Sequence, residues 1–426
     1  MIGKDIHLFA GELWPFNRSI TGKGVRQTLN KISKHLPMLK ILSVPTGTKV
    51  FDWSIPKEWN VKEAYIITPD GEKICDFSKN NLHLVGYSIP FNGQLNFDEL
   101  KKHLYTLPDQ PNAIPYVTSY YQERWGFCLT QNKLNVLKNG KYKVVINSNL
   151  SDGELNYGEL LIKGKSEKEI FLSTYICHPS MANNELSGLS VVTFIAKWLR
   201  TVDHLNYSYR IIFVPETIGS ITYLSYNLKN MKQNIYAGFN VSCIGDERAY
   251  SYLPSRNGKS ISDLIAKHVL KWVDPKFKEY SWFDRGSDER QYCSPGIDLP
   301  VASIFRTKYG EYSEYHTSLD DLKNVVTPNG LDGGYWALRK SIEAIENNKK
   351  YEVTTLCEPQ MGKRGLYPTI SIKDRYEKTK LTMDFLSLCD GNTTLLEIAE
   401  SLNLPIWELY ELSNKLKSHN LITEVK

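Results

Sequence analysis

The spacing of hydrophobic and polar positions changes twice along the chain. Residues 1–50 carry apolar side chains at helical intervals, at Val25, Leu29 and Ile32, followed by a short strand-like run over 39–44. This part of the pattern predicts an opening helix and a strand.

Between about residues 50 and 131 the pattern consists of short alternating runs separated by turn residues. Pro69-Asp70-Gly71 lies between two such runs and predicts a hairpin, because glycine adopts the positive φ of a turn at little steric cost. We therefore predict a small β-rich domain over residues 51–130. The α/β pattern starts before this region and resumes after it, so we interpret the region as an insertion.

After the β-rich region, nearly continuous apolar strands alternate with amphipathic helices. The expected strands are 170–177, 209–214, 235–244 and 299–305, and the expected helices are 189–199, 220–228, 261–272 and 330–346. Strands that are apolar on both faces are typical of a mostly parallel sheet with helices on each side. The predicted fold class is α/β, with a mostly parallel mixed sheet built from residues 1–50 and 131–355.

The C-terminal residues 376–426 predict a winged-helix domain. The run LTMDFLSLCD predicts its first helix, a capping box from Thr394 to Glu397 opens the second, helical spacing over 406–416 gives the third, and Leu421 begins a wing. Five lysines against eight acidic residues give this region a net charge of −3. Because DNA binding needs cations to neutralise phosphates, we expect a packing or protein-contact role, with DNA binding as the less favoured alternative.

Composition and charge exclude several classes of protein. Hydrophobic residues make up 41% and charged residues 23% of the 426 positions, close to globular averages. No apolar stretch is long enough for a bilayer and no basic-then-apolar leader is present, so we expect a cytoplasmic protein without a membrane partner. The 52 basic and 47 acidic residues nearly balance, which does not indicate a nucleic-acid partner. The seven cysteines form no CxxC or zinc-ribbon motif.

The chemistry-bearing motifs point to a metal or carboxylate site. The sequence contains no GxxxxGK[ST] phosphate loop, no complete dinucleotide fingerprint and no GxSxG elbow. Instead, His178, Glu216 and Asp246 each follow a predicted strand, and ligands bind beyond the carboxyl ends of parallel strands. His316, in the loop before the last long helix, could return to that edge. Imidazole with carboxylates suits zinc.

Each of these residues also has a structural explanation. A histidine at a strand end is often held by hydrogen bonds alone. Glu216 could cap the helix that follows it, and Asp246 could be an ordinary turn carboxylate. The metal-site hypothesis therefore depends on the residues occurring together.

Several segments carry a resemblance to a known family. CHPS…NNELSG, PETIGS, GDERAYSYLPSRNG, GSDERQY and YHTSLDD follow one another as in zinc exopeptidases of the leucyl aminopeptidase and glutaminyl cyclase type. More closely, the chain resembles a bacterial aminopeptidase-like family that has an inserted β-domain and a winged-helix tail and is often linked to polysaccharide biosynthesis. The resemblance extends from WPFNRSITGKGVR through FDWSIPKEW and IPYVTSYY to the C-terminal region. It implies a zinc aminopeptidase-like catalytic domain.

The resemblance also implies roles for individual residues. Glu216 matches the general base that removes a proton from metal-activated water, and His178, Asp246 and His316 match metal ligands. Glu185 is a fourth candidate ligand. The implied cofactor is one or two zinc ions.

Two departures from the zinc aminopeptidase pattern bear on the number of metals. The pattern has Asp-Asn-x-Ser-Gly, whose aspartate bridges two ions, whereas this chain has Asn184 there, followed by Glu185. The pattern also has a Glu-Glu pair that supplies a base and a ligand, whereas this chain has Glu216 followed by Thr217. Either Glu185 takes over a ligand role or the site holds a single zinc.

Two arginines are candidates for substrate binding. Arg256 and Arg290 could each hold a substrate carboxylate or phosphate, although a structural ion pair explains each equally well. We therefore expect a zinc-dependent aminopeptidase-like hydrolase whose substrate is a peptide or small amide. The alternatives are an amidase acting on an N-acylated sugar or nucleotide-linked intermediate, and a non-catalytic scaffold or regulator that uses the winged helix. The oligomeric state is left open, with a homo-oligomer among the options.

Overall fold

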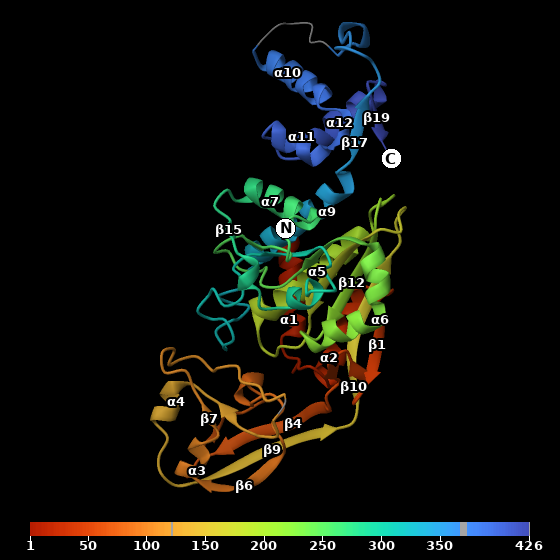
Figure 1. The fold of residues 1–426 in the computed structure, drawn as a ribbon. Helices are drawn as coiled ribbons and strands as arrows, with labels where there is room; N and C mark the ends of the chain where they lie inside the picture. The colour runs from red at the N-terminus through yellow and green to blue at the C-terminus, as the bar shows by residue number, and fades with distance from the viewer. Residues whose placement is uncertain (121, 367–372, 426) are drawn as a thin grey trace. The chain divides into compact units, whose positions relative to one another are not determined.

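The chain folds into two compact units, shown in a computed structural model that describes residues 1–120, 122–366 and 373–425 (Figure 1). The first unit comprises Met1–Asp263 and Phe277–Trp336, and the second comprises Leu264–Lys276 and Ala337–Lys426. All candidate site residues belong to the first unit, so its architecture determines the site.

An eight-stranded mixed sheet forms the centre of the first unit, in the order β1-β10-β12-β11-β13-β16-β14-β15. The bounds are β1 Lys40–Pro45, β10 Glu154–Ile162, β11 Glu169–Tyr175, β12 Ser208–Val214, β13 Ile235–Asn240, β14 Ser251–Leu253, β15 Lys278–Glu279 and β16 Val301–Phe305. The central strands β12, β11, β13 and β16 are parallel. Strand β10 runs antiparallel to both of its neighbours, and β14 runs antiparallel to β16 but parallel to β15. Every residue of β11, β12 and β16 is buried, as the apolar runs predicted.

The helices cover the sheet on both sides. The helices that lie wholly in the first unit include α1 Ile2–Leu13, α2 Lys23–His35, α5 Ser187–Leu199, α6 Ile218–Asn234 and α8 Glu289–Tyr292. Helices α7 Ile261–Val273 and α9 Pro328–Asn347 each begin in the first unit and end in the second. The β11–α5–β12 and β12–α6–β13 connections run in opposite directions along the sheet, so right-handed crossovers place α5 and α6 on opposite faces. The predicted α/β class is confirmed, and α1, which contacts α5, is an additional helix.

A four-stranded antiparallel sheet, in the order β5-β4-β9-β6, forms the core of the insertion. Its strands are β4 Glu58–Ile67, β5 Lys73–Ile74, β6 Phe91–Asn96 and β9 Lys141–Ser151. The predicted hairpin is confirmed, since Ile66 pairs with Ile74 and Gly71 has a φ of 89°. The sheet extends beyond the expected boundary at residue 130, because β9 pairs with β4 and β6. A run of alternating residues predicts a strand without indicating which sheet it joins.

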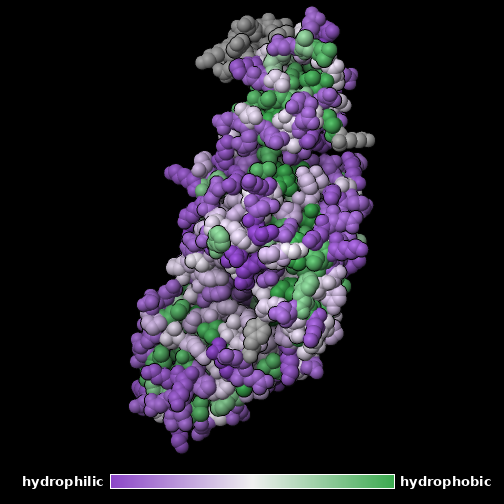
Figure 2. Space-filling model, in the orientation of Figure 1, coloured by the Kyte–Doolittle hydropathy of each residue, from purple (hydrophilic) through white to green (hydrophobic). Residues whose placement is uncertain are grey.

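The shorter elements of the first unit lie between β1 and β4 and, within the insertion, between β6 and β9. They are β2 Lys49–Val50, β3 Trp53–Ser54, β7 Leu104–Tyr105, β8 Phe127–Cys128, α3 Phe97–Lys101 and α4 Gln131–Asn135. None of the helices in the described part of the chain is long and apolar enough to cross a bilayer. On the face shown in Figure 2, hydrophilic side chains predominate and apolar ones are scattered among them.

The second unit contains the predicted winged helix. Its elements are β17 Lys350–Val353, α10 Lys373–Ser387, β18 Asp390–Thr394, α11 Leu395–Ser401, α12 Glu408–Ser418 and β19 Ile422–Val425. The capping box is present, because Thr394 accepts from the Glu397 backbone and Glu397 bonds back to Thr394. The three-stranded sheet has the order β18-β17-β19. Its central strand, β17, precedes residue 376, where the sequence placed the start of this domain.

We expect the second unit to lose stability as the pH falls below about 6.5, because of one buried histidine. His268 Nε2 accepts the backbone N–H of Ile406 at 2.9 Å, and its Nδ1 bonds to Glu400. Burial lowers the pKa of His268, and the Glu400 carboxylate opposes this only in part. The unfolded chain therefore binds the proton more readily, so the stabilisation present above 6.5 is lost as the pH falls toward the lower folded pKa.

Calorimetric unfolding of the full chain between pH 7.5 and 5.5 measures this dependence. In His268→Gln the pH dependence of the transition assigned to the second unit should be much reduced. A wild-type transition that does not change over this range would contradict the expectation.

Candidate active site

Three of the predicted site residues meet at the carboxyl edge of the central sheet. His178 follows β11, Glu216 follows β12, and His316 lies in the loop between β16 and α9. All three line a cavity of about 410 Å³, with Tyr116 of the insertion among the other lining residues. This volume is in the range of small-molecule sites, roughly 300–1,000 Å³.

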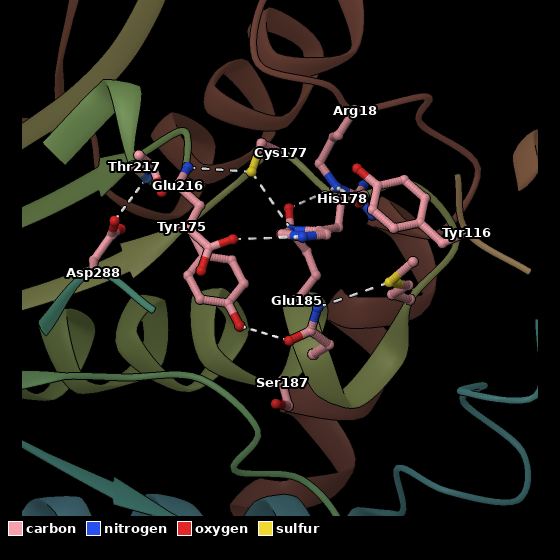
Figure 3. A network of polar contacts seen from close by, with 12 residues as sticks. Arg18, Tyr116, Tyr175, Cys177, His178, Glu185, Ser187, Glu216, Thr217 and Asp288 are labelled. Carbon is pink, nitrogen blue, oxygen red and sulfur yellow. Dashed lines mark hydrogen bonds and ion pairs between the residues drawn. The ribbon is translucent and has the colours of Figure 1, made fainter. Parts of the chain in front are cut away.

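His178 is held in a fixed orientation by an acidic partner (Figure 3). Its Nδ1 lies 3.2 Å from Glu185 Oε2, and its Nε2 lies 3.7 Å from Glu216 Oε2. Burial opposes the charged imidazole, but Cys177, Glu185 and Glu216 outweigh burial and raise the pKa of His178. Surroundings that stabilise a positive charge on this ring also favour a metal ion at its Nε2.

His316 presents a nitrogen atom that no described residue satisfies. Its Nε2 is buried and has no hydrogen-bond partner, and its ring centroid lies 5.4 Å from that of His178. Burial, and then the charge of His178, lower the pKa of His316 to about 3, so the ring is neutral near pH 7. The ring stacks on Tyr315, and the His316 carbonyl accepts the N–H of Tyr116 at 2.9 Å. A neutral, unpaired imidazole nitrogen facing a second imidazole is typical of a metal ligand.

Glu216 stands on a turn that buried groups hold in place. Its backbone N–H bonds to Cys177 Sγ at 3.2 Å, and the N–H of Thr217 donates to Asp288 Oδ1 at 2.7 Å. Burial raises the pKa of Glu216, although the charge of His178 acts in the opposite direction. Burial, and then the charge of Glu216, raise the pKa of Asp288 to about 8. The turn therefore presents one carboxylate of raised basicity to the cavity.

Glu185 does not line the cavity, contrary to its expected role as a ligand. Its Oε1 accepts from Arg18 Nε at 3.1 Å, and both side chains are fully buried. The same Nε donates to the His178 carbonyl at 3.1 Å. Ligand atoms of Cys177, His178 and Glu185 lie within 4.8 Å of one another, but the adjacent guanidinium disfavours a cation between them. Glu185 instead orients His178 from behind, as carboxylates do for metal-binding histidines.

Asp246 is also not brought to the cavity, and its expected role as a ligand is not supported. Strand β13 ends at Asn240 rather than near 244, so Asp246 lies further along the following loop. Its Oδ2 accepts from the Thr307 N–H at 2.8 Å and Asn183 Nδ2 at 3.0 Å. Its Oδ1 accepts from Thr307 Oγ1 at 2.7 Å and the Arg248 N–H at 2.9 Å. Protein donors therefore occupy both oxygens.

Asn184, which stands where the zinc aminopeptidase pattern has a bridging aspartate, also has a structural role. Its Oδ1 accepts from the Tyr175 hydroxyl at 2.7 Å, and its backbone N–H donates to Asp320 at 3.0 Å. An amide held in this way supplies no negative charge for two metal ions. The donors that face the cavity fit one ion better than two.

The two candidate arginines have different surroundings. Arg256 Nε bonds to Asp298 at 2.8 Å in an ion pair in which both side chains are more than 40% exposed, and Arg256 does not line the cavity. Its expected substrate role is therefore not supported. Arg290 does line the cavity, with Nε donating to the Ser287 carbonyl at 2.9 Å and Nη2 to Thr217 Oγ1 at 3.2 Å.

Sequence reasoning missed four residues of this site: Arg18, Tyr116, Cys177 and Asp288. Tyr116 packs against both histidines, with ring centroids 5.5 Å from His178 and 5.2 Å from His316. The segments IPYVTSYY and WPFNRSITGKGVR, quoted above for the resemblance, contain Tyr116 and Arg18. The resemblance was the only sequence signal for Tyr116 and Arg18. Both lie more than sixty positions from His178, and no periodic spacing relates residues that far apart.

Comparison with known proteins agrees with this fold. The family model described as "Domain of unknown function (DUF4910)" matches residues 7–348, and a model described as winged helix-turn-helix matches residues 349–424. A Clostridium acetobutylicum protein whose name refers to polysaccharide biosynthesis and an aminopeptidase-like domain is 47% identical, over 93% of this chain and 91% of its own.

Two solved structures show the same architecture. A candidate peptidase from Clostridium acetobutylicum has a TM-score of 0.94 at 44% identity, covering 100% of this chain and 97% of its own. A zinc aminopeptidase from Bacillus subtilis has a TM-score of 0.56 at 12% identity, covering 80% of this chain and 94% of its own. The region before the winged helix thus has an aminopeptidase-like peptidase fold, and the winged helix follows it from residue 349. The chain belongs to the DUF4910 family, and its resemblance to aminopeptidase-like proteins with a winged-helix tail is confirmed.

Proposed function

We propose that this protein is a zinc-dependent hydrolase of a peptide or other small amide bond. The observation that carries the proposal is the buried, unpaired Nε2 of His316, which shares a cavity with His178 and Glu216. Two imidazoles and one carboxylate make up the His₂Glu donor set of catalytic zinc sites, so the chemistry of these donors suits zinc. Among the described residues the three ligand atoms do not all lie within 4.8 Å of one another, so the side chains would have to close around the ion. His178 and His316 would hold the ion, with the Glu216 carboxylate beside it.

A bound zinc would polarise the scissile carbonyl and lower the pKa of a water molecule toward about 7. The chain itself supplies the proton transfer. Glu216 is the single carboxylate among the described lining residues, so it takes the proton from the attacking water and delivers it to the leaving amine. Burial raises the pKa of Glu216 and makes it a better base near neutral pH. Glu185 and Arg18 keep His178 in place during these steps.

Metal analysis of the purified protein tests this proposal. After expression with added zinc we expect about one zinc per chain, and the double variant His178→Ala/His316→Ala should retain almost none. The matched control is His83→Ala, whose Nδ1 bonds to the Cys128 carbonyl within the insertion and which does not line the cavity. Wild-type protein that binds only a small fraction of one zinc would contradict the proposal.

The substrate is proposed to be an amide in a small molecule. The name of the Clostridium relative refers to polysaccharide biosynthesis, which favours an N-acylated sugar or nucleotide-linked intermediate beside a peptide. Turnover of aminoacyl-nitroanilides would support a peptidase, whereas turnover only of N-acyl sugars would support the amidase.

A non-catalytic scaffold is the second candidate. The observations that favour it are the structural hydrogen bonds of Asp246 and Asn184, which leave few donors for a metal. Protein that neither binds zinc nor hydrolyses any tested amide would establish this alternative.

A further inference from the structure

Among the described residues that line the active-site cavity, Arg290 is the single arginine or lysine. It lies on α8, and its two bonds, to the Ser287 carbonyl and the Thr217 hydroxyl, both go to uncharged acceptors. Among the described residues no carboxylate lies within ion-pair distance of its guanidinium, and its Nη1 has no hydrogen-bond partner. A guanidinium stays charged at every physiological pH. The guanidinium therefore has no carboxylate in direct contact, and its charge acts on Glu216 across the same cavity.

Thr217 explains why no carboxylate is in contact with this cation. Its Oγ1 accepts from Arg290 Nη2 at 3.2 Å, so an acidic side chain at position 217 would pair with the guanidinium. Threonine contributes a neutral hydroxyl instead. Thr217 stands where the zinc aminopeptidase pattern has a second glutamate. This chain therefore lacks that carboxylate, and the positive charge of Arg290 remains available to a ligand in the cavity.

The other acidic groups near the cavity are not among its described lining residues. Asp288 accepts from the Thr217 N–H and the Ser220 hydroxyl through Oδ1, and its Oδ2 is buried without a hydrogen-bond partner. Glu185 pairs with Arg18, and Glu289 accepts from the N–H groups of Gly286 and Ser287 and from the Tyr309 hydroxyl. In the part of the chain that the structure describes, Glu216 is the only carboxylate that lines the cavity. A substrate with a free N-terminal ammonium would need a second carboxylate to bind it and would be repelled by Arg290. The positive charge of Arg290 therefore favours a substrate that carries a negative charge.

We propose that the site takes an amide that carries an oxyanion, a carboxylate or a phosphate, which Arg290 binds through its planar guanidinium, rather than a peptide with a free amino terminus. This inference rests on the proposed amide hydrolysis for its reaction and adds the substrate class. Tyr116 and Thr118 of the insertion line the cavity together with Arg290, so the body of the substrate contacts the insertion. Arg290 is a specificity-determining residue in this assignment.

Calorimetric titration of the full chain tests the assignment without requiring turnover. The probes are two matched pairs: N-acetyl-L-alanine with N-acetyl-L-alaninamide, and N-acetylglucosamine 1-phosphate with N-acetylglucosamine. Each is titrated into the protein as purified and after metal removal by a chelator, so that binding of anions to a metal is measured separately. We expect at least one anion to bind about tenfold or more tightly than its neutral partner in both forms, and the pair with the larger ratio identifies carboxylate or phosphate.

The variants assign this preference to Arg290. Arg290→Gln should abolish it, and Arg290→Lys, which keeps the charge but not the planar fork, should retain only part of it. Thr217→Glu should also abolish it by pairing with the guanidinium. Arg256→Gln is the matched control, since that arginine forms an exposed ion pair away from the cavity, and it should bind like the wild type.

Three outcomes would overturn the inference: equal binding of both members of each pair, a preference that persists in Arg290→Gln, or no binding of either anion. The proposed function fails separately, through absence of zinc and of turnover in a protein that still prefers anions. Conversely, efficient turnover of aminoacyl-nitroanilides without any anion preference would support the proposed amide hydrolysis and refute the anionic substrate class.

Discussion

Glu216→Gln is expected to lower amide hydrolysis by about 10²–10⁴-fold, the usual contribution of a general base. The amide has nearly the same shape as the carboxylate but cannot accept a proton from water. The turn that carries it is held by backbone N–H groups, which donate to Cys177 and Asp288, so the fold should survive the change. Steady-state kinetics on the best substrate found for the wild type measures the effect.

The zinc content of this variant separates two roles of the carboxylate. Unchanged zinc with lost turnover identifies Glu216 as the base, whereas lost zinc identifies it as a ligand, consistent with its 3.7 Å separation from His178 Nε2. Glu314→Gln is the matched control, because Glu314 pairs with Arg248 near the surface and does not line the cavity. Full activity in Glu216→Gln would refute both roles.

Arg18→Met is expected to lower the free energy of unfolding by about 3–5 kcal/mol, because it leaves a buried carboxylate without its partner. Arg18 and Glu185 are both fully buried, and Arg18 Nη1 also donates to the Leu13 carbonyl at 2.7 Å. Methionine fills much of the space but donates no hydrogen bond. Urea unfolding of the full chain near pH 7, followed by tryptophan fluorescence, measures the loss for the first unit.

The double variant Arg18→Met/Glu185→Met shows how much of this loss comes from the uncompensated charge. We expect it to recover much of the stability, since replacing both members of a buried pair by apolar groups is often neutral. It should nevertheless bind zinc less well, because His178 loses the partner of its Nδ1. Arg248→Met, in an ion pair closer to the surface, should cost at most about 1 kcal/mol. Similar losses in Arg18→Met and Arg248→Met would refute the argument.

The structure brings some of the predicted site residues to one cavity and not others, and the reason differs from residue to residue. His178 and Glu216 lie where expected because each directly follows a buried parallel strand, and the ends of such strands meet by topology. Asp246 was assigned by the same rule, but β13 ends earlier than its apolar run suggested, and the following loop carries the aspartate to Thr307. The placement of His316 was correct although it followed from no periodicity, since it lies on a loop.

The sequence by itself determined the alternation of strands and helices, the hairpin at Pro69-Asp70-Gly71, the capped helix at Thr394 and the resemblance to aminopeptidase-like proteins. Each of these depends on residues near one another in the chain, where burial leaves a periodic trace.

Only the tertiary structure decided that β9 pairs with the strands of the insertion, that Glu185 faces Arg18 instead of the cavity and that Arg290 has no acidic partner there. These outcomes depend on contacts between segments far apart in the sequence. A single side chain in such a contact contributes no periodicity from which its partner could be predicted.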